Sequence, residues 1–196
     1  ETEIGKGRPG WHIECSAMSM KYLGETFDIH TGGVDNIFPH HENEIAQSVA
    51  ATGKPFVKYW MHSTHLIVEG KKMAKSLGNF YTVRDLLDKG YPAVAIRYLL
   101  LSTHYRVPLN FTFDGLDAAK SSIQRLRDFC DIVAAAGKPE LPSERVDAQI
   151  QKVKDGFVAG LDDDLNISPA LAAIFDFVRD INRLIAEEGI SKEDSQ

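Results

Sequence analysis

The chain has 196 residues, of which 43% are hydrophobic and 26% charged, with a formal net charge of −6; this is the composition of a globular protein with room for one domain, or one domain plus an appendage. No apolar run approaches the roughly 18 residues of a membrane span, so we expect no membrane partner, and two cysteines are too few for a secreted disulfide scaffold, which favours a cytoplasmic setting. The acidity argues against indiscriminate nucleic-acid binding but leaves room for a localised contact with one RNA.

The first 110 residues mix short apolar stretches with glycines, a pattern typical of alternating strands and helices. It predicts two strands, at residues 27–30 and 65–69. It also predicts three helices, at residues 43–52, 82–89 and 92–103. Thr82 is the predicted N-cap of the middle helix, and Gly90 its stop. This alternation indicates an α/β sheet unit.

After about residue 113 the apolar residues recur at steps of three and four, which predicts one long amphipathic helix. Cys130 falls on the apolar stripe of this helix, so we interpret it as a small core residue rather than a functional thiol. Residues 135–144, AAGKPELPSE, contain glycine and two prolines and are predicted to form a loop.

The remaining residues predict two further helices. Residues 145–160 form the weaker of the two, and Ser168 is a predicted N-cap that places Pro169 at the first position of the other. The polar tail, residues 187–196, is expected to fray. Together with the long helix, these segments indicate the start of an α-helical bundle.

Charge and histidine are unevenly distributed along the chain. Residues 1–110 hold 12 Lys and Arg against 11 Asp and Glu, a balance of +1, whereas residues 111–196 hold 10 against 17, a balance of −7. All seven histidines lie in the first part. We therefore expect two domains with this boundary, with the chemistry in residues 1–110 and an acidic scaffold in residues 111–196.

The segment PHHENEIAQS, residues 39–48, places His40 and Glu44 four residues apart. On a helix the two side chains share one face. An imidazole and a carboxylate so placed could hold one Zn²⁺, although the spacing differs from the H-E-x-x-H pattern of metalloproteases. The alternative is a polar helix start, which also explains Pro39 and the acidic first turn.

A third possible ligand, Cys15, lies upstream in the segment GRPGWHIECSAM. A thiolate, an imidazole and a carboxylate would fill three of the four tetrahedral positions of zinc. The alternative is a buried thiol in a short helix that begins near Ile13. Spacing alone does not decide between these interpretations.

Two further segments carry candidate ligand-binding residues. The segment EGKKMAKSLGNF places three lysines within five residues after a predicted strand, which suits a polyphosphate because lysines are mobile point charges. In HTGGVDNIFPH, Gly32 and Gly33 permit close approach of a ligand, and Asp35 could accept hydrogen bonds from a ribose. A solvated basic turn and an ordinary turn aspartate are the alternatives.

Taken together, these segments closely resemble the cysteinyl-tRNA synthetase family of class I aminoacyl-tRNA synthetases, over nearly the whole chain and most specifically through residue 80. The matching segments, in the family's order and spacing, are GRPGWHIECSAM, FDIHTGGVDNIFPHHENEIAQS, YWMHSTHLIVEGKKMAKSLGNF and LNFTFDGLDAAKSSIQRL. The resemblance implies an α/β fold, the second half of a Rossmann-like catalytic domain followed by an α-helical bundle. The family's H-I-G-H signature and its anticodon-binding C-terminus have no counterpart, so we expect a piece of the enzyme.

The resemblance implies a zinc site that selects the substrate. Cys15, His40 and Glu44 match three of the family's four zinc ligands, and the fourth, a cysteine, has no counterpart here. The Zn²⁺, one per chain, is implied to bind the thiolate of substrate cysteine and so to reject serine. Trp11 matches the aromatic residue at the substrate pocket, which makes it the implied substrate-binding residue.

The resemblance also implies an ATP site. Gly33 and Asp35 fall in the adenosine-contacting turn, and KMAKS, residues 72–76, matches the loop that binds the phosphates of ATP. Lys72 and Lys75 are therefore the implied catalytic residues, and Lys75 also the implied ATP contact. Ala74 stands where serine is commoner, which removes a hydroxyl group but no charge.

The implied reaction joins cysteine to tRNA(Cys) through cysteinyl adenylate, formed from ATP with Mg²⁺. We expect a monomer, and we expect that this chain alone forms no adenylate because half of the ATP site is missing from it. Two alternatives stay open: the similar cysteine:glucosaminyl-inositol ligase of mycothiol synthesis, and a zinc-containing binding fragment without catalysis.

Overall fold

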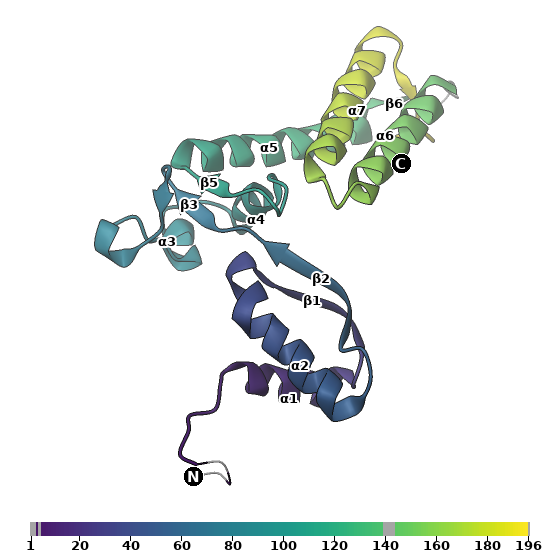
Figure 1. The fold of residues 1–196 in the computed structure, drawn as a ribbon. Helices are drawn as coiled ribbons and strands as arrows, with labels where there is room; N and C mark the ends of the chain where they lie inside the picture. Colours follow the sequence, from purple (N-terminus) through teal and green to yellow (C-terminus); the bar gives the residue numbers. More distant parts are fainter. Residues whose placement is uncertain (1–2, 4, 139–143, 196) are drawn as a thin grey trace. The chain divides into compact units, whose positions relative to one another are not determined.

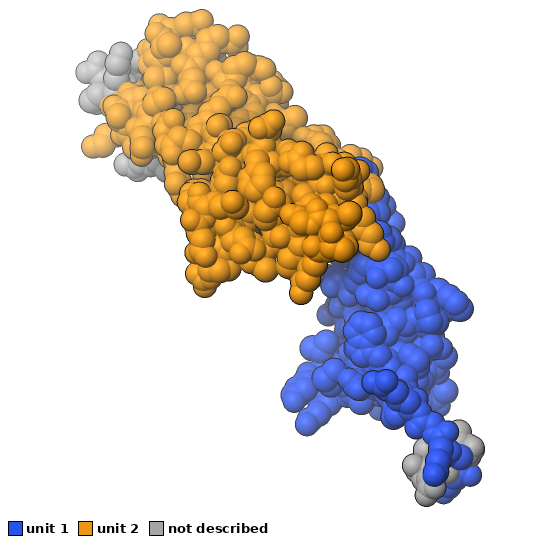
Figure 2. Space-filling model, turned by 90° about the vertical axis from the view of Figure 1, so that its left-hand side faces the viewer, with its two compact units in different colours: residues 1–65, 105–107 blue, residues 66–104, 108–196 orange. Residues whose placement is uncertain are grey.

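The computed structural model describes residues 3, 5–138 and 144–195. The chain divides into two compact units, which Figure 2 shows in blue and orange. The first unit comprises residues 1–65 and 105–107, and the second comprises residues 66–104 and 108–196.

The first unit is a β–α–β arrangement with an additional helix (Figure 1). Strands β1 (Phe27–Gly33) and β2 (Val57–Ser63) pair in parallel. Such strands need a crossover connection, and α2 (Glu42–Thr52) forms it, with α1 (His12–Leu23) packed beside it. Two short helical turns lead from β1 into α2, namely η1 (Val34–Asn36) and η2 (Ile37–His41).

The predictions for this unit are confirmed in part. The strand predicted at residues 27–30 is present and continues to Gly33, and the helix predicted at residues 43–52 is α2. Strand β2 was not predicted, because VKYWMHS shows no regular alternation of apolar and polar residues. The order of strand, helix and strand confirms the α/β class.

The second unit begins with a small sheet packed against helices. Its strands lie in the order β4-β3-β5, with β3 antiparallel to β4 and parallel to β5. The strands are β3 (Leu66–Val68), β4 (Lys71–Lys72) and β5 (Leu109–Phe111), and the short helices are η3 (Lys75–Leu77), α3 (Val83–Asp88) and α4 (Ala93–Leu101). Their shared core is apolar and includes Val68, Ile96, Phe111 and Leu116.

The predicted strand at residues 65–69 and the predicted helices at residues 82–89 and 92–103 are confirmed as β3, α3 and α4. Thr82 is the N-cap of α3, as predicted. Its side chain accepts a hydrogen bond from the Asp85 backbone N–H, and the Asp85 carboxylate accepts one from the Thr82 N–H at 2.7 Å. Gly90 follows the helix with a left-handed φ of 87°, which suits its predicted role as a stop.

Three long helices form most of the remainder of the second unit, namely α5 (Phe113–Ala136), α6 (Glu144–Asp162) and α7 (Ile167–Glu187). Helices α6 and α7 pack side by side (Figure 1). This confirms the long helix, the helix over residues 145–160 and the helical character of this part of the chain. Among the helices of the described residues, none is long and apolar enough to cross a membrane.

Two details of the last helix and the tail were predicted wrongly. Helix α7 begins at Ile167 with Asn166 as its N-cap, so Ser168 is not the cap and Pro169 is the third helical residue. Proline is tolerated there because the first four N–H groups of a helix have no partner within it. Up to residue 195, the last one described, the tail is not frayed: β7 (Ile190–Ser191) pairs in parallel with β6 (Gly137–Lys138), and Ile190 is fully buried.

The prediction for Cys130 was also wrong, because this residue is exposed. The spacing of apolar residues predicts which face of a helix is apolar, but how much of that face is buried depends on the elements that pack against it. The predicted loop at residues 135–144 falls in part on residues 139–143, which lie outside the described residues.

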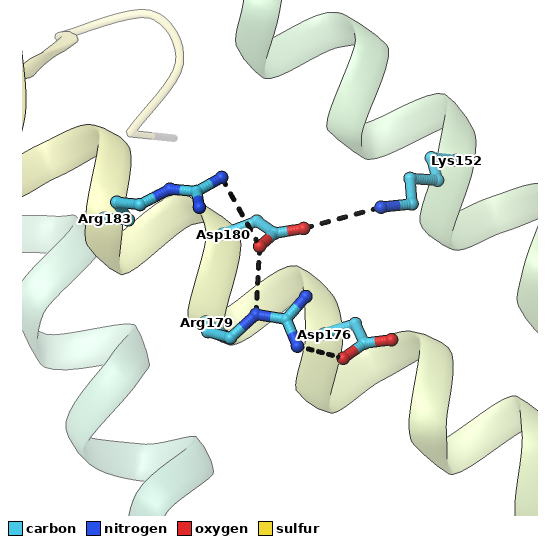
Figure 3. A network of polar contacts seen from close by, with 5 residues as sticks. All are labelled: Lys152, Asp176, Arg179, Asp180 and Arg183. Carbon is cyan, nitrogen blue, oxygen red and sulfur yellow. Dashed lines mark hydrogen bonds and ion pairs between the residues drawn. The ribbon is translucent and has the colours of Figure 1, made fainter.

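A buried carboxylate links α6 to α7 (Figure 3). The side chain of Asp180, on α7, is 8% exposed and accepts hydrogen bonds from Arg179 at 3.1 Å and from Lys152, on α6, at 3.5 Å. The guanidinium of Arg183 lies 3.8 Å away. The hydrogen bond from Arg179 is the main reason that the pKa of Asp180 lies below its ordinary value.

We expect Asp180→Asn to lower the free energy of unfolding by about 1–2 kcal/mol at pH 7, because it removes the charge that three partly exposed cations share. The lowered pKa fixes the sign of the pH dependence. The carboxylate stabilises the fold above the unfolded-state pKa of about 3.9 and loses this effect as the pH falls through the folded-state pKa. Urea denaturation at pH 7, 5 and 3 should therefore show the two proteins converging in acid.

Asp176→Asn is the matched control, because Asp176 pairs with Arg179 from a position that is 53% exposed. Such a surface pair contributes little, so the control should stay within about 0.5 kcal/mol of the wild type. Equal losses in the two variants, or a difference that does not change with pH, would contradict this account of Asp180.

Candidate metal centre and lysine loop

The three predicted metal ligands come together in the first unit. Cys15 lies on α1, His40 in η2 and Glu44 on α2, and their ligand atoms all lie within 4.8 Å of one another. The His40 Nε2 atom is 2.8 Å from Glu44 Oε1, and the Glu44 side chain is fully buried. The spacing of four residues thus places both side chains on one face, although η2 differs from a regular α-helix at Phe38.

The surroundings of Glu44 fit a metal ion better than they fit a helix cap. Oε1 of Glu44 is buried and makes no hydrogen bond, although His40 Nε2 is close to it. A buried carboxylate oxygen without a hydrogen bond is costly, and a cation held by a thiolate, an imidazole and this oxygen would satisfy it. The N-cap of α2 is His41, which makes no side-chain capping hydrogen bond, although the first turn of α2 is acidic, with Glu42 and Glu44, as the alternative of a polar helix start requires.

Burial, followed by the negative charges of Glu44 and Glu14, raises the pKa of the Cys15 thiol. Such a cysteine stays protonated at neutral pH when no cation is near it. A bound metal ion would reverse this balance, because a coordinating thiol is deprotonated. Cys15 therefore has the properties of a ligand that becomes a thiolate when metal binds.

A second layer of histidines surrounds the trio, and the sequence analysis did not identify it. His30, on β1, lies with Nε2 2.8 Å from Glu44 Oε2, so both oxygens of Glu44 face an imidazole. His41 Nδ1 lies 2.8 Å from Nε2 of His62, on β2. A second group of potential ligand atoms, from His30, His41 and Glu44, also lies within 4.8 Å.

His41 is 4% exposed, and burial, with the nearby histidines His30, His62 and His40, lowers its pKa to about 4. It is therefore neutral at neutral pH. Its ring occupies the space beside Gly32, where a Cβ atom would lie 2.5 Å from His41 Cε1. Glycine is thus needed at this position to admit the histidine ring.

The other predicted residues of the first unit lie near the trio or at the end of β1. The ring of Trp11, which is 64% exposed, lies 4.6 Å from the ring of His40. Gly33 is the last residue of β1, and Asp35 follows it as an exposed residue of η1. A Cβ atom on Gly33 would lie 2.2 Å from the Asp35 carboxylate, so glycine permits this turn.

The predicted phosphate-binding lysines belong to the second unit. We call residues 71–78 the lysine loop; it runs from β4 through η3 and ends at Gly78, whose φ of 65° is left-handed. Lys72 and Lys75 are both exposed, and neither forms an ion pair with any described residue. The ammonium group of Lys75 lies 5.3 Å from the centre of the Phe80 ring. The loop therefore presents cations that no carboxylate of the described residues neutralises.

Comparison with known proteins identifies two matching families. The model for tRNA synthetases class I (C) catalytic domain matches residues 1–121, and the model for the DALR domain matches residues 156–196. Among solved structures, the LeuRS–tRNA–LeuAMS ternary complex of Agrobacterium radiobacter K84 has a TM-score of 0.61 and 21% identity, and covers 80% of this chain and 23% of that one. That likeness supports the fold alone.

Curated relatives are similar along the whole chain. It is 57% identical over 197 residues to the cysteine–tRNA ligase of Protochlamydia amoebophila, and 55% identical over 199 residues to that of Chlamydia muridarum. Each alignment covers 100% of this chain and 41% of the relative, so the chain spans well under half the length of these relatives. The cysteine–tRNA ligase of Solibacter usitatus is 55% identical over 93% of the chain. These matches confirm the resemblance found in the motifs, and the chain belongs to the class I (C) family of tRNA synthetases.

Proposed function

We propose that the protein is a cysteine–tRNA ligase, which activates cysteine with ATP and transfers it to tRNA(Cys). The observation that carries this proposal is the trio of Cys15, His40 and Glu44 around a buried carboxylate oxygen without a hydrogen bond. The similarity of the whole chain to proteins that bear this name supports it. We assign residues 1–110 to the catalytic domain and residues 111–196 to the helical domain.

In this proposal the metal trio selects the substrate. Cys15, His40 and Glu44 would hold Zn²⁺, which supplies a soft Lewis acid that prefers a thiolate to a hydroxyl group. His30 holds the other oxygen of Glu44, which keeps the carboxylate in place. Trp11 borders the same place through its contact with His40, as expected for a residue that lines the amino-acid pocket.

The lysine loop would act on ATP. The carboxylate of cysteine attacks the α-phosphorus, a new P–O bond forms, and the bond to pyrophosphate breaks. Lys72 and Lys75 would stabilise the charge that develops on pyrophosphate, together with the Mg²⁺ that accompanies ATP. Gly33 and Asp35 would contact the adenosine, where the exposed carboxylate is free to accept hydrogen bonds from ribose hydroxyls.

Cysteine-dependent exchange of pyrophosphate into ATP by the intact protein tests the first half-reaction. We expect exchange with cysteine and none above background with serine, because the hydroxyl group of serine is a poor zinc ligand. Product analysis with tRNA(Cys) and with glucosaminyl-inositol as acceptors then separates the two ligases. Transfer to the amino-sugar alone would reject the tRNA ligase, and tRNA binding without any exchange would favour a non-catalytic role.

A further inference from the structure

We propose that Asn79 is a positioning residue that holds the lysine loop in the shape that presents Lys72 and Lys75 to a polyphosphate. The inference rests on the proposed function for the role of the lysines, but the contacts of Asn79 are independent of it. Asn79 follows Gly78 directly, so it closes the loop at its far end.

The amide group of Asn79 bonds to the loop backbone on both sides of Met73. Its Oδ1 atom accepts a hydrogen bond from the Ala74 N–H at 2.9 Å, and its Nδ2 group donates one to the Lys72 carbonyl at 3.1 Å. If the amide of Asn79 were flipped, its NH₂ group would face the Ala74 N–H and its oxygen would face the Lys72 carbonyl. The two hydrogen bonds therefore define its orientation. In a longer strand, the Ala74 N–H and the Lys72 carbonyl would bond to the backbone of a neighbouring strand. Here the side chain of Asn79 takes that place.

Met73, between the two clamped groups, points toward the core of the second unit. It packs on the buried cluster that includes Val68 and Phe111, and it is one of the residues that line an apolar pocket of about 130 Å³. Lys72 and Lys75 lie on either side of it and are exposed. Met73 therefore anchors the loop to the apolar core and Asn79 bonds to its backbone, while the lysine side chains stay accessible.

A fixed backbone matters here because lysine side chains are long and flexible. Their charges stabilise a transition state only if the chain that carries them is already in place, and small displacements of catalytic groups are expensive. Alanine at position 79 would remove both bonds and leave the Ala74 N–H and the Lys72 carbonyl to water. The loop would then sample several shapes.

Amide hydrogen exchange in the intact protein, followed by NMR, tests the clamp without ATP. We expect the Ala74 amide to exchange about tenfold faster in Asn79→Ala, in line with the loss of a hydrogen bond of about 1.4 kcal/mol. Asn79→Asp keeps an acceptor for this N–H but loses the donor, so its Ala74 amide should exchange as in the wild type. Equal exchange of Ala74 in the wild type and in Asn79→Ala would overturn the clamp.

Asn110 is the matched control, because its side chain accepts a hydrogen bond from the Gly70 N–H at 2.8 Å, at the turn before the loop. Asn110→Ala should speed the exchange of Gly70 and leave that of Ala74 unchanged. Asn79→Ala should do the reverse. Faster exchange of both amides in Asn79→Ala would mean general loosening, which also overturns a specific positioning role.

Pyrophosphate exchange kinetics then test whether the clamp serves the lysines. In the intact protein, Asn79→Ala should lower kcat about tenfold and leave the KM for cysteine unchanged, because Asn79 belongs to the unit without the metal trio. An unchanged kcat despite faster Ala74 exchange would overturn the positioning role. Absence of any exchange activity in the intact wild-type protein, rather than in this chain alone, would instead contradict the proposed function, whereas the amide measurement would still decide the clamp.

Discussion

Replacing Cys15 by alanine should strip the protein of its zinc. The purified wild type should hold about one zinc per chain after dialysis, whereas the variant should hold less than about 0.1, because two remaining protein ligands do not retain zinc in a stable site. The geometry supports a large effect, since the donor atoms of His40 and Glu44 lie within 4.8 Å of the Cys15 sulfur. Elemental analysis of the dialysed proteins measures it directly.

The chain offers a matched control in its other cysteine. Cys130 is exposed on α5, in the unit without the trio, so Cys130→Ala should keep its zinc. Each variant has lost one thiol. If zinc bound to thiols adventitiously, the two variants would lose the same amount of zinc, whereas a specific site loses it only in Cys15→Ala. The prediction fails if Cys15→Ala and the wild type carry the same amount of zinc, or if the dialysed wild type carries none.

Local sequence patterns were enough to predict the features that short-range contacts determine. The pairing of His40 with Glu44 follows from a spacing of four, and the N-cap of α3 follows from Thr82 at the start of the segment. Cys15 was a candidate third ligand from its residue type, and only the resemblance assigned it to the same site as the other two, which spacing alone left open. These residues were therefore identifiable before any coordinates.

The histidine layer behind the trio depends instead on how β1 pairs with β2. His30 lies opposite Trp60, and Gly32 lies opposite His62, only because the strands pair in one parallel register. A shift of one residue would move each side chain to the other face. Because β2 itself shows no clear alternation, neither the strand nor its register could be predicted, and His62 had no visible link to His41.

The same reason explains the error at the C-terminal end of the chain. Polar composition suggested that residues 187–196 fray, but Ile190 and Ser191 are buried where β7 pairs with β6. The partner segment, Gly137–Lys138, is separated from β7 in the sequence by helices α6 and α7. Composition describes a segment in isolation, whereas burial here comes from a contact that is distant along the chain.

In the intact protein, Lys75→Ala should lower the kcat of the proposed cysteine-dependent pyrophosphate exchange by about a hundredfold, since removing one preorganised charge from a transition state costs on the order of 3 kcal/mol. Lys75 is exposed and pairs with no carboxylate among the described residues, so its charge is available to a ligand. The KM for cysteine and the zinc content should stay unchanged, because Cys15, His40 and Glu44 belong to the other unit. Steady-state kinetics and elemental analysis of the same preparation check all three expectations.

Lys71→Ala is the matched control, because it removes the same charge from an exposed position of the same loop. If Lys75 acts on the phosphates through a defined position, Lys71→Ala should retain most of the activity. If the loop only raises the local concentration of ATP through its total charge, the two variants should lose activity equally, and the loss should shrink at high salt. A loss of zinc in Lys75→Ala would show that the two sites are not independent, contrary to their separate construction in the two units.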